Sequence, residues 1–279
     1  MSASGWLRGA MLFLAIGLVV GWSLAPALWQ LSTAVKPDAQ ITRFPTVYLP
    51  HPPTGEHFAG LMERKPFAAY LVNSAWICGL ATTLSVLLGA LAAGALSRAG
   101  DRGRETILLG LLVFALFPPI VLLFPLYEGV RALGWLNQPI ALILPYAALG
   151  LPLAVWILDS GYRQIPREID EAARLDGLSA LGRIFRIHVP LAAPSLVTAA
   201  ILVFISCWNE FMLALTFMTR DDRKTVTAGI ASVGAASLHE IPWGQLSAAV
   251  VIATAPLVLL VLLFERRIAS GLTRGAVKG

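Results

Sequence analysis

Six stretches of this chain are each long and apolar enough to cross the hydrocarbon core of a bilayer, which takes about 20 residues. They lie at Ala10–Leu31, Leu71–Leu96, Ile107–Tyr127, Pro139–Leu158, Ser195–Phe217 and Gln245–Phe264. The first runs beyond the apolar region of a signal peptide and lacks a cleavage site, so it is interpreted as an uncleaved span. The sequence therefore predicts an all-α, polytopic membrane protein with six transmembrane helices.

The composition agrees with this fold class. Of 279 residues, 57% are apolar and 13% are charged, about half the usual charged share, which excludes a disordered chain and a typical soluble domain. Cys78 and Cys207 lie inside apolar stretches. They form neither a CxxC motif nor a disulfide framework, and we expect buried small hydrophobes.

The basic residues predict the orientation of the chain. The net charge is +5, but the charges lie in short loops, so they indicate topology and not a nucleic-acid partner. With both termini cytoplasmic, 13 of the 21 Lys and Arg residues face inward. The predicted organisation is an N-terminal helix with its outer loop (1–70), a five-helix core (71–264) and a cytoplasmic tail (265–279). The core includes an inner loop at 159–194 and an outer loop at 218–244.

The inner loop has the pattern of a helix–glycine–helix unit. Pro166 suits the first helical position, acidic residues follow in the first turns, Gly177 suits a helix C-terminus and Ser179 suits the next N-cap. Apolar residues recur on one stripe of the first helix (Ile165, Ile169, Ala172, Ala173) and one side of the second (Leu181, Ile184, Phe185, Ile187), which ends at Pro190 and Pro194.

Small residues beside an exposed carboxylate, Glu171, would let a partner approach closely and offer it an ion pair. The pattern therefore predicts a docking surface. The alternative is an amphipathic hairpin on the lipid surface, although its acidic first helix is poorly suited to an anionic inner leaflet.

This loop resembles the signature of ABC-importer permeases, E-A-A-x3-G-x9-I-x-L-P. The matching residues are Glu171-Ala172-Ala173, Gly177 and Ile187-His188-Val189-Pro190, where Val189 replaces the leucine. Three further segments are similar to carbohydrate importers of the maltose type, particularly to MalG-like subunits and to trehalose and maltose permeases of the SugB kind. These are Asn73-Ser74, Trp208-Asn209-Glu210-Phe211 and the tail Gly271–Gly279.

The resemblance implies a type I ABC importer permease of the bacterial inner membrane, carrying a di- or oligosaccharide such as trehalose or maltose. Its partners would be a cytoplasmic ATPase dimer, a second, MalF-like permease and an extracytoplasmic sugar-binding protein. The chain has no GxxxxGK[ST] motif, so it is not expected to be an ATPase, nor to need a cofactor.

In this family the helix Pro166–Asp176 would be the coupling helix. Glu171 would pair with a basic ATPase residue, Ala172 and Ala173 would allow close packing, and Gly177 would make the turn. Asp176 lies beside this surface, where it either contacts the ATPase or forms a solvated charge pair with Arg174. The tail would insert between the ATPase subunits, or it is a frayed end.

The fifth apolar stretch carries the candidate pathway residues. Asn209 and Glu210 lie about 21 Å along it at 1.5 Å per residue. Because an ionisable group there is costly, they either line the sugar cavity or its outer gate, or form interhelical hydrogen bonds. Trp208 is a sugar-stacking platform or, more consistent with its position, an interface aromatic.

The roles of six prolines and of the second outer loop can each be interpreted in two ways. Six prolines in the third and fourth stretches indicate either broken helices at the pathway or packing kinks: Pro118, Pro119, Pro125, Pro139, Pro145 and Pro152. The loop Met218–Gly244 either reaches into the sugar-binding protein or is simply solvated.

Rival classes fit less well. A secondary transporter would carry several mid-membrane charges and an inverted repeat, whereas Glu210 is the single candidate. A membrane enzyme would need a motif such as HExxH or GxSxG, and neither occurs. We therefore expect no catalytic residue and no metal site. A purely structural subunit would not need the permease-like loop.

Overall fold

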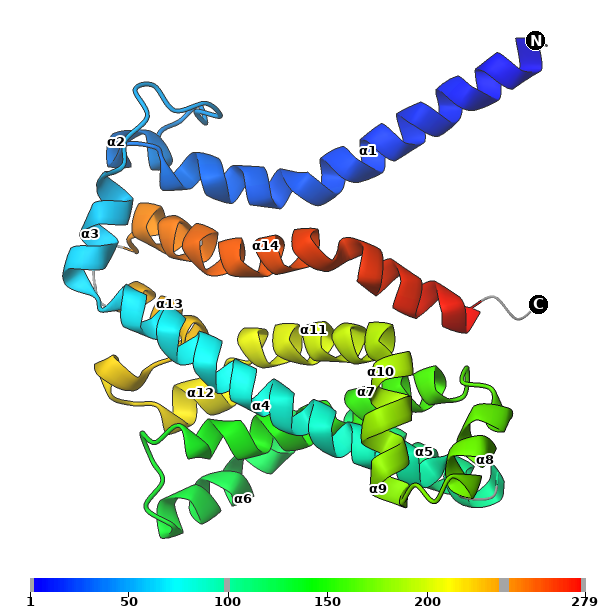
Figure 1. Cartoon of the computed structure of the whole chain (residues 1–279). Helices are drawn as coiled ribbons and strands as arrows, with labels where there is room; N and C mark the ends of the chain where they lie inside the picture. Colours follow the sequence, from blue (N-terminus) through cyan, green and yellow to red (C-terminus); the bar gives the residue numbers. More distant parts are fainter. Residues whose placement is uncertain (1–2, 98–100, 236–240, 277–279) are drawn as a thin grey trace. The chain divides into compact units, whose positions relative to one another are not determined.

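The computed structural model confirms the all-α fold class. It describes residues 3–97, 101–235 and 241–276, with side chains described between residues 11 and 265 of these ranges, and the described chain is helical with connecting loops (Figure 1). The elements are α1 (Ala3–Ala34), α2 (Asp38–Ile41), α3 (Glu56–Arg64), α4 (Phe67–Leu96), α5 (Asp101–Leu116), α6 (Pro119–Ala132), α7 (Ile140–Tyr162), α8 (Arg167–Leu175), α9 (Ala180–Arg183), the π-helical turn η1 (Ile184–His188), α10 (Val189–Leu191), α11 (Ala193–Asn209), α12 (Met212–Phe217), the 3-10 turn η2 (Asp221–Arg223), α13 (Val226–Gly234) and α14 (Trp243–Ala276).

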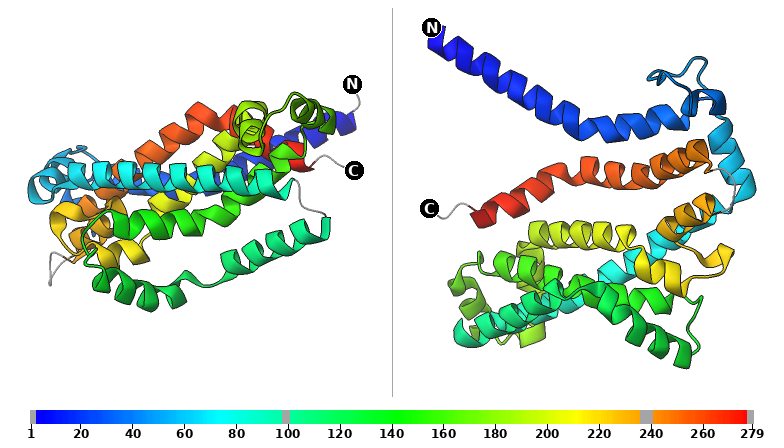
Figure 2. Two further views of the ribbon diagram at one scale, coloured as in Figure 1. Left: turned by 60° about the horizontal axis from the view of Figure 1, so that its bottom comes forward. Right: turned by 180° about the vertical axis from the view of Figure 1, so that it is seen from behind.

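Four helices among the described residues are long and apolar enough to span a membrane: α1, α4, α7 and α14. Two bent pairs bring the number of spans to six if each pair counts as one. The first pair is α5 with α6, at 85° (Figure 2), and the second joins Ala180–Leu191 to α11, at 84°.

The third predicted stretch, Ile107–Tyr127, contains the bend between α5 and α6, so of the two alternatives for its prolines the structure has a broken helix. Pro118 and Pro119 occupy the break, and Pro118 has an extended backbone with ψ of 119°. Neither residue has an N–H to continue the helical ladder. By contrast, α7 stays continuous through Pro145 and Pro152, so proline alone does not break a helix in this chain.

The fifth predicted stretch, Ser195–Phe217, is also not one helix. α11 ends at Asn209, Glu210 is extended with ψ of 131°, and α12 begins at Met212. The preceding helix, which the sequence predicts to end at Pro190 and Pro194, runs to Leu191 and thus ends between these two prolines, and Ala192 separates it from α11.

The chain divides into two compact units, Met1–Phe67 with Ile230–Ala255 and Ala68–Gly229 with Pro256–Gly279. In the first unit, the Lys36 side chain is buried, with its ammonium 4.2 Å from the centre of the Trp29 ring. Burial lowers the pKa of Lys36. His57 Nε2 donates to the Lys36 carbonyl oxygen at 2.7 Å, so α3 is tied to the segment that follows α1.

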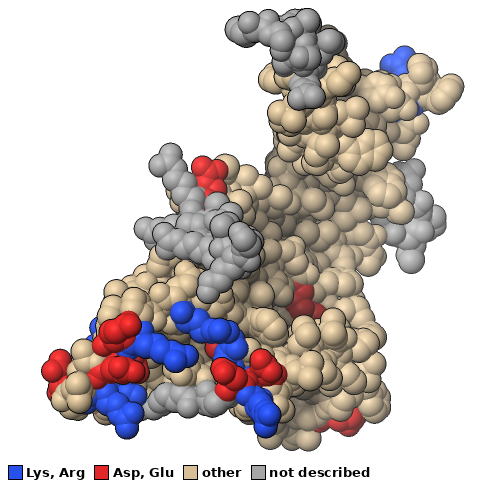
Figure 3. Space-filling view, turned by 90° about the vertical axis from the view of Figure 1, so that its right-hand side faces the viewer, with Lys and Arg blue, Asp and Glu red and all other residues tan. Residues whose placement is uncertain are grey.

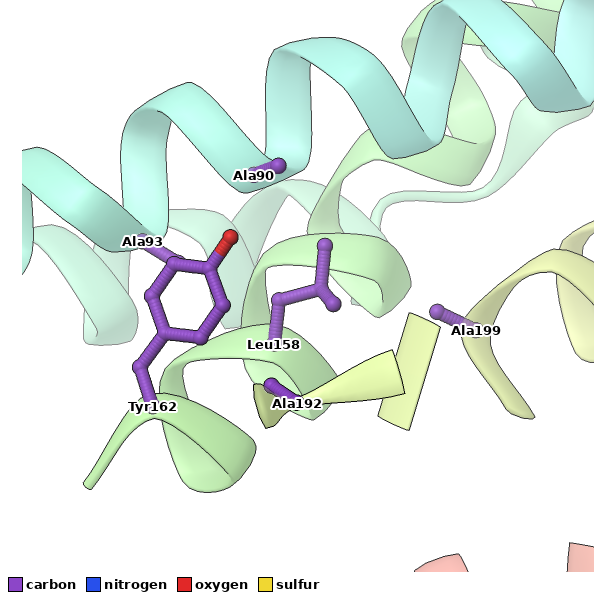
Figure 4. Packing of buried hydrophobic residues seen from close by; sticks show 6 residues of the cluster. All are labelled: Ala90, Ala93, Leu158, Tyr162, Ala192 and Ala199. Atoms are coloured by element: carbon purple, nitrogen blue, oxygen red, sulfur yellow. The ribbon is translucent and has the colours of Figure 1, made fainter. Parts of the chain in front are cut away.

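In the second unit, α4, α7 and α11 pack through small residues, as is common between transmembrane helices. A Cβ at Gly150 would lie 2.7 Å from Val203 Cγ1 and 2.9 Å from Ser85 Oγ. The Ser85 hydroxyl itself donates to the Ala147 carbonyl at 2.8 Å. Toward the other end, alanines from α4 and α11 surround Leu158 and Tyr162 of α7 (Figure 4).

The sequence also made predictions for the two cysteines and for the C-terminal tail. Cys78 and Cys207 are free and buried, as predicted. The backbone of α14 continues into the predicted tail as far as Ala276. The tail side chains after Glu265 lie outside the described residues.

The close packing at Gly150 makes a stability prediction. Gly150→Ala should lower the free energy of unfolding by about 1–3 kcal/mol, because Val203 and Ser85 must shift. Gly110→Ala in α5 is the control, since its Cβ would meet nothing within 4 Å. It should be neutral or stabilise by up to about 1 kcal/mol. Equal unfolding temperatures for the two variants in detergent would contradict this packing.

Candidate coupling and pathway sites

The short helix α8 ends in a glycine-stabilised cap, as predicted. Gly177 adopts φ of +80°, its N–H donates to the Arg174 carbonyl at 3.1 Å, and the Leu178 N–H donates to the Ala173 carbonyl at 3.0 Å. This is the Schellman arrangement, in which a left-handed residue lets the last carbonyls accept hydrogen bonds. Ser179 Oγ then accepts the Gly182 N–H at 3.1 Å, capping α9.

The start of α8 differs from the sequence prediction by one residue. Pro166 is the N-cap, with ψ of 137°, and Arg167 is the first helical residue. Because this ψ value lies outside the helical range, Pro166 precedes the first turn and does not belong to it. The acidic first turn, with Glu168 and Asp170, is present as predicted.

α8 exposes most of its side chains. Glu171, Ala172 and Asp176 are exposed, and Leu175 is 89% exposed, whereas Ala173 is buried. Figure 3 shows charged side chains of both signs gathered on one part of this face of the molecule, with mostly uncharged surface elsewhere. A surface with a small residue, an apolar side chain and a carboxylate side by side is suited to close contact with another protein.

One carboxylate of α8 points to its own loop instead. Asp170 Oδ1 accepts from Arg183 Nε at 3.1 Å and lies 3.0 Å from His188 Nε2. Both partners are buried, Arg183 at 9% and His188 at 6% exposed. This cluster was not predictable from the sequence, because no spacing rule relates residues that are 13 and 18 positions apart.

A second ion pair joins α5 to α7. The Arg104 guanidinium contacts both carboxylate oxygens of Asp159, with Nε to Oδ1 at 3.0 Å. Asp159 is 3% exposed, and a buried carboxylate needs such a partner. The signal in the sequence was an acidic residue directly after an apolar stretch, but nothing in the sequence identified Arg104 as its partner.

The break at Glu210 is held by hydrogen bonds to three elements. Its carboxylate accepts the Leu213 and Ala214 N–H groups at 2.9 and 3.2 Å and the Tyr146 hydroxyl of α7 at 2.8 Å. Its backbone carbonyl accepts the Thr227 hydroxyl of α13 at 2.7 Å. The carboxylate therefore caps α12 and satisfies the first backbone groups of that helix.

The three predicted pathway residues have different surroundings. Asn209 is exposed, and its amide donates to the Ile205 carbonyl one turn earlier at 2.8 Å. Glu210 is half-buried and bonded as described. Trp208 is 4% exposed, with its ring 5.6 Å from that of Phe204. Of these three residues, Asn209 is the one whose side chain is exposed at the surface of this chain.

The first part of the segment predicted to be the second outer loop, 218–244, is anchored to α4. The Asn73 amide donates to the carbonyls of Asp222 and Lys224, each at 3.0 Å, and Ser74 Oγ accepts the Val226 N–H at 2.8 Å. The Asn73-Ser74 pair, noticed in the sequence through resemblance alone, thus has a clear structural role. It holds residues 222–226 against the start of α4.

Comparison with known proteins identifies related chains over nearly the whole length. Residues 85–274 match the family described as "Binding-protein-dependent transport system inner membrane component". The sulfoquinovosyl glycerol transport system permease protein SmoH of Agrobacterium fabrum is 38% identical, covering 96% of this chain and 93% of that protein.

Two further relatives are 40% identical. The trehalose transport system permease protein SugB of Mycobacterium tuberculosis matches over 94% of this chain and 95% of its own length. The trehalose/maltose transport system permease protein MalG of Thermococcus litoralis matches over 98% of both chains. A chain of a bacterial ABC transporter that imports the polysaccharide alginate has the same fold, with a TM-score of 0.77, 20% identity and coverage of 95% and 98%.

We expect the hydrogen bonds of the Glu210 carboxylate to stabilise the protein. Glu210→Ala should lower the free energy of unfolding by about 1–3 kcal/mol, because buried donors lose their acceptor. Asn209→Ala, which removes one exposed bond within a helix, should change it by about 0.5 kcal/mol or less. Chemical unfolding of both variants in detergent measures the difference, and a Glu210→Ala protein as stable as the control would show that the cap contributes nothing.

Proposed function

Since the chain belongs to the family of binding-protein-dependent inner membrane components, the multi-pass permease subunits of ABC transporters, we propose that it forms half of the translocation pathway of a sugar importer. The observation that carries this proposal is the exposed unit of α8, Gly177 and α9, in which Glu171 and Ala172 face outward. The relatives named for trehalose, maltose and sulfoquinovosyl glycerol support a sugar cargo, and we expect a di- or oligosaccharide such as trehalose or maltose.

In this proposal α8 is the coupling helix and docks in a cleft of a separate ATPase. Glu171 forms an ion pair with a basic residue of that subunit, and Ala172 allows the two backbones to approach. Ala173, with its side chain buried, packs α8 onto its own loop, while Gly177 fixes the turn. Asp176 sits at the rim of the contact. Closure of an ATPase dimer on ATP then displaces α8 and drives alternating access.

The other partners follow from the surfaces that the chain presents. α1 is uncharged from Met11 to Ala34 and exposes large apolar side chains, among them Phe13 and Trp22, as expected for contact with lipid or a second, MalF-like permease. The anchored outer loop at 218–229 faces an extracytoplasmic sugar-binding protein. An alginate importer in complex with a periplasmic protein has a related fold, with a TM-score of 0.66 and 16% identity. Both termini lie in the cytoplasm, because Lys and Arg favour that side.

The segment Trp208–Glu210 lies on the sugar pathway in this proposal. The exposed Asn209 amide offers a donor and an acceptor to sugar hydroxyls. Glu210 holds the break between α11 and α12 at the outer gate, and Trp208 packs behind it. These assignments place polar groups at the point where the span changes direction.

The coupling role predicts the effect of a charge reversal. Glu171→Arg should leave the subunit inserted but abolish sugar-stimulated ATP hydrolysis, because two like charges then meet at the docking surface. Glu63→Arg makes the same change on the exposed surface of α3 and should leave hydrolysis unchanged. The assay is ATPase activity of the purified complex, and unchanged stimulation in Glu171→Arg would contradict docking through α8.

Uptake by intact cells separates an importer driven by ATP from an ion-coupled transporter. Cells with and without this gene are given labelled trehalose, maltose, sulfoquinovosyl glycerol or diacetylchitobiose. The proposal predicts gene-dependent accumulation of at least one sugar, sustained when a protonophore is added and cellular ATP is maintained. Uptake that stops when the proton gradient is removed, although cellular ATP is maintained, would favour secondary transport.

The C-terminal tail is proposed to contribute to assembly with the ATPase. If 271–279 inserts between ATPase subunits, its deletion should reduce the amount of ATPase that co-purifies with a tagged permease, without reducing the amount of permease in the membrane. Full ATPase recovery after the deletion would show that the tail is a free end.

A further inference from the structure

We call the segment from α8 through η1 (Arg167–His188) the coupling loop, and on one side of α8 its packing against the rest of the unit is interrupted. A cavity of about 490 Å³ lies between α8 and the neighbouring ends of α4, α5 and α7. Charged groups line it on both sides, including Arg104 and Arg163 on one side and Arg167 and Arg174 on α8. A displacement of α8 is therefore not transmitted through continuous packing on this side, and discrete contacts must carry it.

One of these contacts is made by the Asp170 carboxylate. A single oxygen, Oδ1, lies 3.1 Å from Arg183 Nε and 3.0 Å from His188 Nε2. Arg183 also donates from Nη1 to the Leu178 carbonyl at 3.2 Å, inside the turn that joins α8 to α9. Asp170 thus fixes α8 to both ends of η1, to Arg183 directly before it and to His188 as its last residue.

That segment is in turn seated on the membrane helices. Ile184, next to Arg183, is 2% exposed and packs on α4 at Gly94, where an added Cβ would lie 2.5 Å from Ile184 Cγ1 and Cδ1. The His188 ring lies 5.0 Å from the ring of Tyr162 in α7. Tyr162 belongs to the buried cluster with Ala93 of α4 (Figure 4).

The π-helical turn η1 supports this arrangement. It widens the helix between Ile184 and His188, and such turns are often found at functional sites. Arg183 and His188 both face Asp170 although they are five residues apart, a separation that an α-helix would not place on one face. After η1 the chain continues through α10 into α11, which ends at Asn209, directly before the break at Glu210.

We propose that Asp170 is the positioning residue that makes the coupling loop one lever, so that displacement of α8 moves α4, α7 and α11 together. This inference rests on the proposed function, because it needs an ATPase to move α8. It assigns to Asp170 a role distinct from docking. Glu171 faces the partner, whereas its neighbour Asp170 faces the protein and transmits the motion.

The test compares transport with hydrolysis in proteoliposomes of the complete importer and its binding protein. Asp170→Asn keeps the shape of the side chain but removes its charge. We expect assembly and basal hydrolysis to persist, while sugar transported per ATP falls at least about fivefold, within the range of ordinary coupling free energies. A defect confined to docking or folding would lower both rates together and leave the ratio intact.

Three further variants make the comparison specific. Arg183→Gln should lower the ratio in the same direction as Asp170→Asn, and the double variant should be no worse than Asp170→Asn alone, because both changes act on the contact between residues 170 and 183. Asp170→Glu, which keeps the carboxylate, should restore part of the ratio. Arg186→Gln removes an exposed charge from η1 and should transport as much sugar per ATP as the unaltered protein.

The outcomes separate the two ideas. If the unaltered complex shows binding-protein-stimulated hydrolysis and Asp170→Asn keeps the original ratio, the lever is wrong and the proposed function stands. Additive losses in the double variant would also overturn the lever. An unaltered complex with no stimulated hydrolysis would contradict the proposed function and, with it, this inference.

Discussion

The arrangement of the helices depends on how three carboxylates, one buried and two half-buried, are satisfied. Asp159 binds Arg104 and joins α7 to α5, Asp170 binds Arg183 and His188 and closes the coupling loop, and Glu210 caps α12 while accepting from Tyr146 of α7. A carboxylate in such surroundings is strongly unfavourable without donors. Each one therefore specifies which neighbouring element must lie beside it.

Much of this fold was predictable because its signals are local. Apolar length gave the spans, and Gly177 and Ser179 gave the cap geometry of the inner loop, which the structure reproduces. The breaks at Pro118–Pro119 and at Glu210 were harder. Proline removes a donor at all of its positions, yet α7 tolerates two of them, so the outcome depends on neighbours that a single sequence does not reveal.

The partners of the buried charges were not predictable for the same reason. Arg104 and Asp159 are 55 positions apart, and Tyr146 and Glu210 are 64 apart, so folding alone brings them together. Small residues at Gly94, Gly150 and Gly161 allow the close helix packing that places these groups. The structure separates the exposed residues of α8 from an internal link at Asp170, and we propose that the first dock on the ATPase while the second transmits its motion.

The most direct test of this account is the mass of the intact complex, measured after mild-detergent purification through a tag on this chain. We predict one copy of this chain, one distinct permease and two ATPase subunits. A stable homodimer or single chain without an ATPase would contradict the importer, and would leave the exposed surface of α8 without the partner that the account assigns to it.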